Sequence, residues 1–143
     1  MKFDTGTELP DNFVLTKEFS DVYNLINDTN VNLFITGKAG SGKSTLLEYF
    51  RQNTNKNFVT LAFQGITAIK AKGQTLHSFF KFGPHFLAKE EIKLLKDKSL
   101  IQSLDTILID EISMVRADLF DAIDLSLKKN RKNNKPFGGV QMI

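Results

Sequence analysis

Cysteine is absent from the 143 residues of the chain. Without it the protein forms no disulfide, uses no thiolate nucleophile and holds no zinc through sulfur, which excludes several enzyme classes. Any bound metal must therefore have oxygen ligands or one of the two histidines, His77 and His85, as its ligands. Magnesium is the ion that fits a set of oxygen ligands best.

Long apolar runs are also missing. No stretch approaches the roughly 18 to 20 apolar residues that cross a bilayer, and the opening MKFDTGTELP lacks the apolar core of a signal peptide. We therefore expect an intracellular, cytoplasmic protein with no membrane partner. Arginine is scarce, and a net charge of +3 is too small to argue for nucleic acid by itself.

The size and composition are those of one globular domain. Apolar residues make up 41% and charged residues 24% of the chain, which predicts neither disorder nor a fibrous repeat. The first residues are polar, so we expect a lead-in over residues 1–14 and a single domain over residues 15–143. No internal repeat is visible.

Apolar patterning predicts strands that alternate with helices. Short apolar runs predict strands at residues 31–36, 58–62 and 106–109, and the last four residues, 140–143, begin a fourth. Helical spacing predicts helices at residues 17–26, 44–52 and 115–128 and shorter helical pieces near residues 66–69, 75–80, 89–95 and 99–104. This order indicates an α/β fold in which helices flank a parallel sheet in three layers.

Residues 37–44, GKAGSGKS, match the phosphate-binding pattern GxxxxGK[ST] at every fixed position. Glycines let successive backbone N–H groups approach phosphate oxygens, and the helix that follows adds its positive end. We expect Lys43 to contact the β- and γ-phosphates of ATP and the Ser44 hydroxyl to bind Mg²⁺. A glycine-rich turn before a helix is the alternative. The candidate nucleotide-binding residues are Gly37, Lys38, Ala39, Gly40, Ser41, Gly42, Lys43, Ser44 and Thr45.

Asp110 and Glu111 follow the predicted strand TILI. A strand that ends in an acid beside a phosphate-binding loop predicts that Asp110 holds Mg²⁺ through water. Glu111 then orients or deprotonates the attacking water. Together with Lys43 these acids form the predicted catalytic set. The alternative is a strand that runs into a solvated turn.

The segment AFQGITAIKAKGQTLHSFFKFGP, residues 62–84, mixes hydroxyl, basic and aromatic side chains at the end of the second predicted strand. Ligands of open α/β sheets bind at this edge. Polar side chains there are candidates for phosphate or sugar contact, lysines add charge, and three phenylalanines are candidate stacking surfaces. These residues are Gln64, Thr67, Thr75, His77 and Ser78; Lys70, Lys72 and Lys81; and Phe79, Phe80 and Phe82.

Structural roles are the alternative for this segment, because most phenylalanines lie in a core and most histidines make structural hydrogen bonds. The basic run at residues 128–135, KKNRKNNK, also has two interpretations. It is either a solvated loop or a nucleic-acid contact.

In their order along the chain, GKAGSGKSTLL, GQTLHSFF, IDEISMV and NKPFGGVQMI resemble the motifs of Pif-type superfamily 1 DNA helicases, relatives of the RecD subunit. The resemblance implies an ATP-dependent 5′-to-3′ DNA helicase whose first RecA-like domain is represented here up to motif III. It implies single-stranded and forked duplex DNA as partners, a second RecA-like domain for hydrolysis, and a monomer. The DNA-contact candidates are then Phe63, Gln64, Gly65, Thr75, His77 and Ser78.

The chain departs from that family at several places, one of which is Thr67 where an alanine is common. Phe63 and Gln64 stand where the family usually has Pro-Thr, and Phe19 in LTKEF stands where the family favours a glutamine that reads adenine. Two other functions remain as alternatives: a small P-loop kinase or non-helicase ATPase, and a DNA-binding module that does not hydrolyse nucleotide. Kinases of this kind carry arginine-rich lids, whereas this chain has three arginines, Arg51, Arg116 and Arg131.

Overall fold

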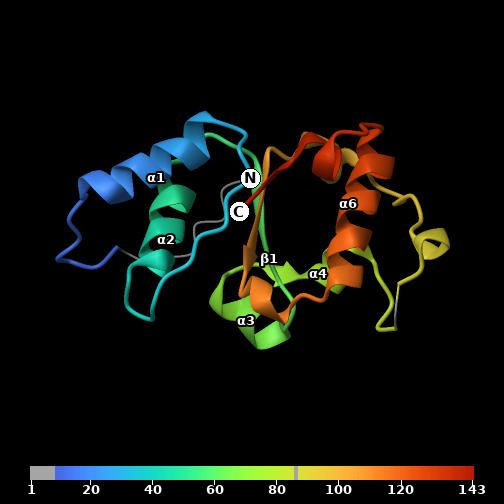
Figure 1. Ribbon diagram of the computed structural model, residues 1–143, viewed down its shortest axis with the longest axis horizontal. Helices are drawn as coiled ribbons and strands as arrows, with labels where there is room; N and C mark the ends of the chain where they lie inside the picture. The colour runs from blue at the N-terminus through green and yellow to red at the C-terminus, as the bar shows by residue number, and fades with distance from the viewer. Residues whose placement is uncertain (1–8, 86) are drawn as a thin grey trace. The chain divides into compact units, whose positions relative to one another are not determined.

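The computed structural model describes residues 9–85 and 87–143 (Figure 1). They divide into two compact units, one that ends at Lys56 and also takes in Ile143, and one that spans residues 57–142. Most of the predicted lead-in, residues 1–8, lies outside the described residues, and residues 9–14 contain no helix or strand. The prediction of a single domain over residues 15–143 stays a prediction.

The first unit contains two helices, α1 (Lys17–Asp28) and α2 (Lys43–Asn53), both predicted. Thr16 caps α1, because its hydroxyl accepts a hydrogen bond from the Phe19 backbone N–H at 3.2 Å. The helices are joined through aromatic rings and through Lys56, whose ammonium donates to the Ile26 carbonyl at the end of α1 at 2.7 Å.

The strand predicted at residues 31–36 is wrong, because this segment has no strand in the structure. A strand forms only as a member of a ladder, and the described part of the first unit contains no strand to pair with it. The side chains of Val31 and Phe34 are accordingly 52% and 75% exposed. The apolar run had predicted a buried strand.

The second unit is built on a four-stranded parallel sheet in the order β2-β1-β3-β4. The predicted strands β1 (Phe58–Ala62), β3 (Thr106–Asp110) and β4 (Gln141–Met142) are present. Sequence patterning missed β2 (Gln74–Thr75), which is two residues long. The predicted fold class, a parallel α/β sheet flanked by helices, is confirmed.

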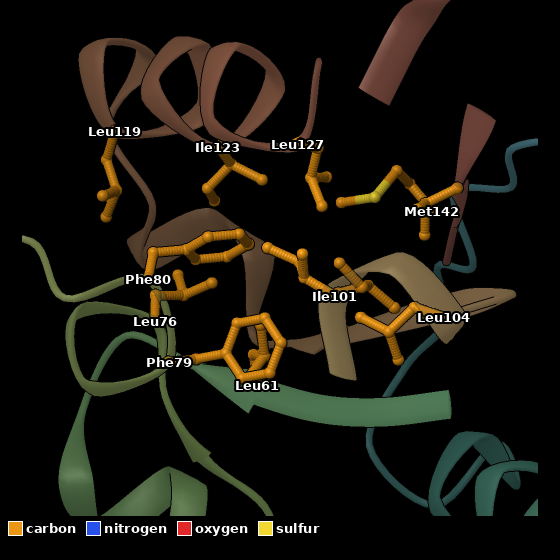
Figure 2. Packing of buried hydrophobic residues seen from close by; sticks show 12 residues of the cluster. Leu61, Leu76, Phe79, Phe80, Ile101, Leu104, Leu119, Ile123, Leu127 and Met142 are labelled. Carbon is orange, nitrogen blue, oxygen red and sulfur yellow. The ribbon is translucent and has the colours of Figure 1, made fainter. Parts of the chain in front are cut away.

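One face of this sheet is covered by the core of the unit. Helix α6 (Ala117–Arg131) turns Leu119, Ile123 and Leu127 toward the core, where they meet α4 (Leu76–Phe80) and α5 (Ser99–Ser103) (Figure 2). The short helix α3 (Gly65–Lys70) connects β1 to β2. No helix among the described residues is long and apolar enough to cross a membrane.

The helix predicted at residues 89–95 is mostly wrong. It is reduced to a 3₁₀ turn, Lys89–Glu91, because the backbone beyond this turn bonds to side chains of α6. Lys129 donates to the carbonyl of Ile92 at 2.9 Å, and Asn130 accepts from the N–H of Leu95 at 2.8 Å. These tertiary hydrogen bonds replace those of a helix.

Gly73 supplies a stability test of the β1–β2 contact. A Cβ at this position would overlap the backbone carbonyl of Thr60 in β1, and backbone cannot move aside as a flexible side chain does. We expect Gly73→Ala to lower the free energy of unfolding by about 1 to 3 kcal/mol in urea titrations. Gly65→Ala is the matched control, because a Cβ there meets nothing within 4 Å. Equal stability of the two variants would contradict the close approach.

Candidate functional site

The candidate phosphate-binding loop, residues 37–45, adopts a conformation that its glycines make possible. Gly40 and Gly42 have φ values of 78° and 97°, in the left-handed region that side chains rarely enter. Gly42 also precedes α2, whose first turn carries no acidic residue. The first N–H groups of α2 therefore meet no competing carboxylate and are suited to an anion.

Lys43 folds back over this loop, and its ammonium donates to the carbonyl oxygen of Gly37. A phosphate oxygen is an acceptor of the same kind as that carbonyl oxygen. Ser44 is exposed in the first turn of α2, so its hydroxyl is accessible to a ligand. The loop thus presents an ammonium, a hydroxyl and backbone N–H groups together.

Asp110 ends β3, and Glu111 follows it in a left-handed conformation with φ 54°. Such a backbone is costly for a residue with a side chain and is often found at functional sites. Among the described residues, neither carboxylate has a hydrogen-bond or ion-pair partner, so both are available. A carboxylate of this kind fits Mg²⁺ through its preference for oxygen ligands.

Lys43 and Ser44 belong to the first unit, whereas Asp110 and Glu111 belong to the second. Each pair is described within its own unit. The predicted position of Asp110 beside the phosphate-binding loop, and the shared Mg²⁺ ligation with Ser44, therefore stay predictions.

The second unit brings the two acids together with the candidate nucleic-acid residues. In the parallel register Ala62 of β1 pairs with Thr75 of β2 on one side and with Asp110 of β3 on the other. Residues that follow these three must leave the sheet at the same edge. The DNA-contact candidates and Glu111 thus share the carboxyl edge of the sheet.

Within that edge the six DNA-contact candidates differ in exposure and in the contacts they already make. Gln64, Gly65 and Ser78 are exposed, whereas Phe63, Thr75 and His77 are half-buried. The Thr75 hydroxyl already accepts the Ser78 backbone N–H at 3.2 Å and so caps α4. The rings of Phe63 and His77 contact each other with centroids 5.7 Å apart.

The prediction that Phe79 and Phe80 of α4 are stacking surfaces is wrong. Phe79 and Phe80 are buried in the core, and Phe82 is partly buried against it with its ring stacked on that of Phe80 at 5.3 Å. Because β1 and α6 need apolar partners, these rings are used inside the protein. Phe79 and Phe80 are therefore not available to a base, whereas stacking by Phe82 stays a prediction.

Three cations of the predicted basic run make internal contacts. Lys128 pairs with Asp124 at 2.6 Å, and Lys129 donates to the Ile92 carbonyl at 2.9 Å. Arg131 donates to four backbone carbonyls, namely those of Ile101, Gln102, Leu104 and Gly138. The solvated-loop interpretation is therefore wrong for these three residues, which lie in α6 and secure its end. A direct DNA contact of the run stays a prediction.

Phe19 packs in an aromatic cluster of the first unit. Its ring lies 5.2 Å from that of Phe13 and 5.5 Å from that of Tyr49, and Tyr23 joins them at 4.9 Å from Tyr49. Burial in this cluster raises the pKa of the Tyr23 hydroxyl. Phe19 therefore makes apolar contacts at the position where the related helicase motif favours a hydrogen-bonding glutamine.

A charged pair near the acidic turn was missed from the sequence. Arg116 donates from Nε and Nη2 to the two carboxylate oxygens of Asp118, both at 3.0 Å, at the start of α6. These hydrogen bonds hold the pKa of the Asp118 carboxyl below its usual range. A spacing of two residues is not a pairing signal in a helix, so only the geometry of the helix start reveals this pair.

Comparisons with known proteins all point to one family. The sequence model described as PIF1-like helicase matches residues 14–143. The ATP-dependent DNA helicase RRM3 of Saccharomyces cerevisiae is 34% identical over 140 residues, and the ATP-dependent DNA helicase PIF1 of Homo sapiens is 36% identical over 117 residues. These alignments cover 91% and 78% of this chain but 19% and 18% of the relatives.

Solved structures agree with this comparison. Pif1 from Bacteroides in complex with ADP-AlF3 and ssDNA has a TM-score of 0.81 and 41% identity, covering 92% of this chain and 32% of that chain. A structure of two Pif1 helicases at forked dsDNA has a TM-score of 0.82, also at 41% identity, covering 91% and 32%. The chain thus spans about a third of these proteins.

The left-handed backbone of Glu111 predicts that its glycine and alanine variants differ in stability in the opposite sense to the usual one. At ordinary positions an alanine variant is more stable than a glycine variant by about 0.5 to 1 kcal/mol. At Glu111 we expect the reverse, with Glu111→Gly more stable than Glu111→Ala by about 1 kcal/mol, because glycine relieves the left-handed strain.

Urea unfolding of both variants measures this difference. Asp121, exposed within α6, supplies the control pair, for which Asp121→Ala should be the more stable variant. The same order at both positions would show that Glu111 carries no strain.

Proposed function

This chain belongs to the PIF1-like helicase family, and from that premise we propose that it forms the nucleotide-binding part of an ATP-dependent DNA helicase. The whole protein uses ATP hydrolysis to move 5′ to 3′ along single-stranded DNA and to separate duplexes. The observation that carries the proposal is the row Thr75, Ala62 and Asp110. This row supports the proposal that the residues for hydrolysis and those for DNA contact lie at one edge of the sheet.

For nucleotide binding, we assign the phosphates of ATP to the loop of residues 37–45. The N–H groups around Gly40 and Gly42 donate to phosphate oxygens. The Lys43 ammonium gives up its hydrogen bond to the Gly37 carbonyl and donates to the β- and γ-phosphates instead. Mg²⁺, when bound, neutralises developing phosphate charge, and its proposed ligands are the Ser44 hydroxyl and, through water, Asp110.

In hydrolysis a water molecule attacks the γ-phosphate, and we assign its orientation and deprotonation to Glu111. The absence of a hydrogen-bond partner for this carboxylate among the described residues supports a role as base, since a base must be free to accept a proton. Its exposed position after β3 also leaves room for water.

For DNA we propose that a single strand crosses the carboxyl edge of β1 and β2. Gln64, Gly65 and Ser78 are exposed there and offer polar groups to phosphates and sugars, and His77 adds its ring nitrogens. Thr75 contributes by capping α4 and thereby placing Ser78. Forked duplex DNA is the proposed substrate of the whole protein.

A second RecA-like domain is proposed to complete hydrolysis, because every arginine of this chain is already engaged. Arg51 lies 3.8 Å from Glu48, Arg116 is bound to Asp118, and Arg131 is bound to backbone carbonyls. Arginines that stabilise phosphoryl transfer increase its rate by about 10³ to 10⁵. We propose that another domain supplies them within a monomeric, cytoplasmic protein.

Lys43 gives a direct test of nucleotide binding. Lys43→Ala should weaken binding of a fluorescent ATP analogue to the chain about tenfold or more, because a charge-assisted hydrogen bond to phosphate is lost. Lys38→Ala, in the same exposed loop, should change affinity much less, since its charge is not aimed at the loop interior in the proposed arrangement. Equal losses would overturn the assigned role of Lys43.

The isolated 143 residues should bind nucleotide weakly and hydrolyse it negligibly, since no arginine is free to assist. We expect phosphate release in the presence of single-stranded DNA to stay close to that of the Glu111→Gln variant. Robust hydrolysis or strand separation by the chain alone would contradict the need for a second domain.

A further inference from the structure

Helix α4 presents only a narrow face to a ligand. Three of its five residues, Leu76, Phe79 and Phe80, are buried in the core, which fixes the rotation of the helix about its axis. His77 and Ser78 are left on the remaining face, at the carboxyl edge of the sheet. Figure 2 shows the three buried side chains entering the core, so the orientation of α4 is determined by packing.

His77 and His85, the two histidines of the chain, have different environments. His85 bonds through Nε2 to the Glu91 carboxylate at 3.2 Å. His77 instead contacts the ring of Phe63, with centroids 5.7 Å apart and ring planes at 67°. No described residue of the second unit hydrogen-bonds a ring nitrogen of His77. Its ring is held by an apolar contact, and its nitrogens stay available.

Phe63 is well placed to hold that ring. It follows β1 directly, and its side chain is partly buried against the core that includes Leu61 and Leu76. Because Ala62 pairs with Thr75, the chain segments that carry Phe63 and His77 leave the sheet side by side. The phenyl ring is thus anchored on one side by the core and contacts the imidazole on the other.

We propose that Phe63 is a positioning residue for DNA binding, which acts through His77. The phenyl ring restricts the imidazole to an orientation in which a ring N–H donates to a phosphate oxygen of the single strand. Edge-to-face ring pairs favour a defined geometry, and a side chain ordered beforehand loses less entropy on binding. This inference rests on the proposed DNA contact at the carboxyl edge.

The test is a double-mutant cycle with the full 143-residue chain. Binding of fluorescein-labelled oligo(dT) is measured by anisotropy at low salt for wild type, Phe63→Leu, His77→Ala and the double variant. Leucine keeps apolar bulk against the core but removes the ring. We expect Phe63→Leu to weaken binding about three- to tenfold and Phe63→Tyr to restore affinity to within about twofold of wild type.

The cycle separates positioning from a general structural effect. If Phe63 acts through His77, the double variant binds no more weakly than His77→Ala, because the imidazole to be oriented is gone. Independent, additive losses would overturn the inference while leaving DNA contact intact. Wild-type chain that does not bind oligo(dT) would instead contradict the proposed DNA contact, and the inference with it.

A readout without DNA tests the orientation itself. Imidazole NMR signals of His77, assigned by their loss in His77→Ala, should shift or broaden in Phe63→Leu and return in Phe63→Tyr. The His85 signals serve as the internal control, since that ring is held by Glu91. Unchanged His77 signals in Phe63→Leu would show that the phenyl ring does not orient the imidazole.

Discussion

Parallel pairing of β1 with β2 on one side and β3 on the other is the constraint on which the carboxyl edge of the sheet depends. One register sets Thr75, Ala62 and Asp110 in a row, so every chain segment that follows them emerges at the same edge. Parallel strands require crossover connections, which here carry α3 between β1 and β2 and both α4 and α5 between β2 and β3. A shift of one residue would turn the buried side chains outward and would also move Glu111 away from the nucleic-acid candidates.

Polar groups at the end of α6 stabilise the opposite, amino-terminal edge of this sheet. Arg131 binds the carbonyls at the end of α5 and that of Gly138, just before β4, while Asn130 and Lys129 hold the segment at residues 92–95. A guanidinium that satisfies several carbonyls at once is a strong structural contact. Arg131 is thus committed to the amino-terminal edge, and Arg116, at the start of α6, is bound to Asp118. This use of the two arginines is consistent with the proposed need for a second domain.

Predictions from the sequence succeeded where local chemistry decides the conformation. Thr16 caps α1, Gly40 and Gly42 adopt left-handed backbone in the candidate phosphate-binding loop, and the apolar stripe of α6 faces the core. They failed where distant residues compete for the same groups. Residues 92–95 lost their helix to side chains of α6, and Phe79 and Phe80, candidates for base stacking, were needed in the core. A sequence pattern records the apolar character of a ring but not which partner covers it.

The sequence by itself determined the parallel α/β class, and it located the candidate phosphate-binding loop with Lys43 and Ser44 and the two candidate acids, because each of these depends on residue types at short spacing. Only the tertiary structure decided which candidates can meet a ligand. It engaged all three arginines, used the Thr75 hydroxyl as a helix cap, and set the Phe63 ring against His77. These outcomes depend on strand register and on which face of a short helix is buried, and neither is encoded in a local motif.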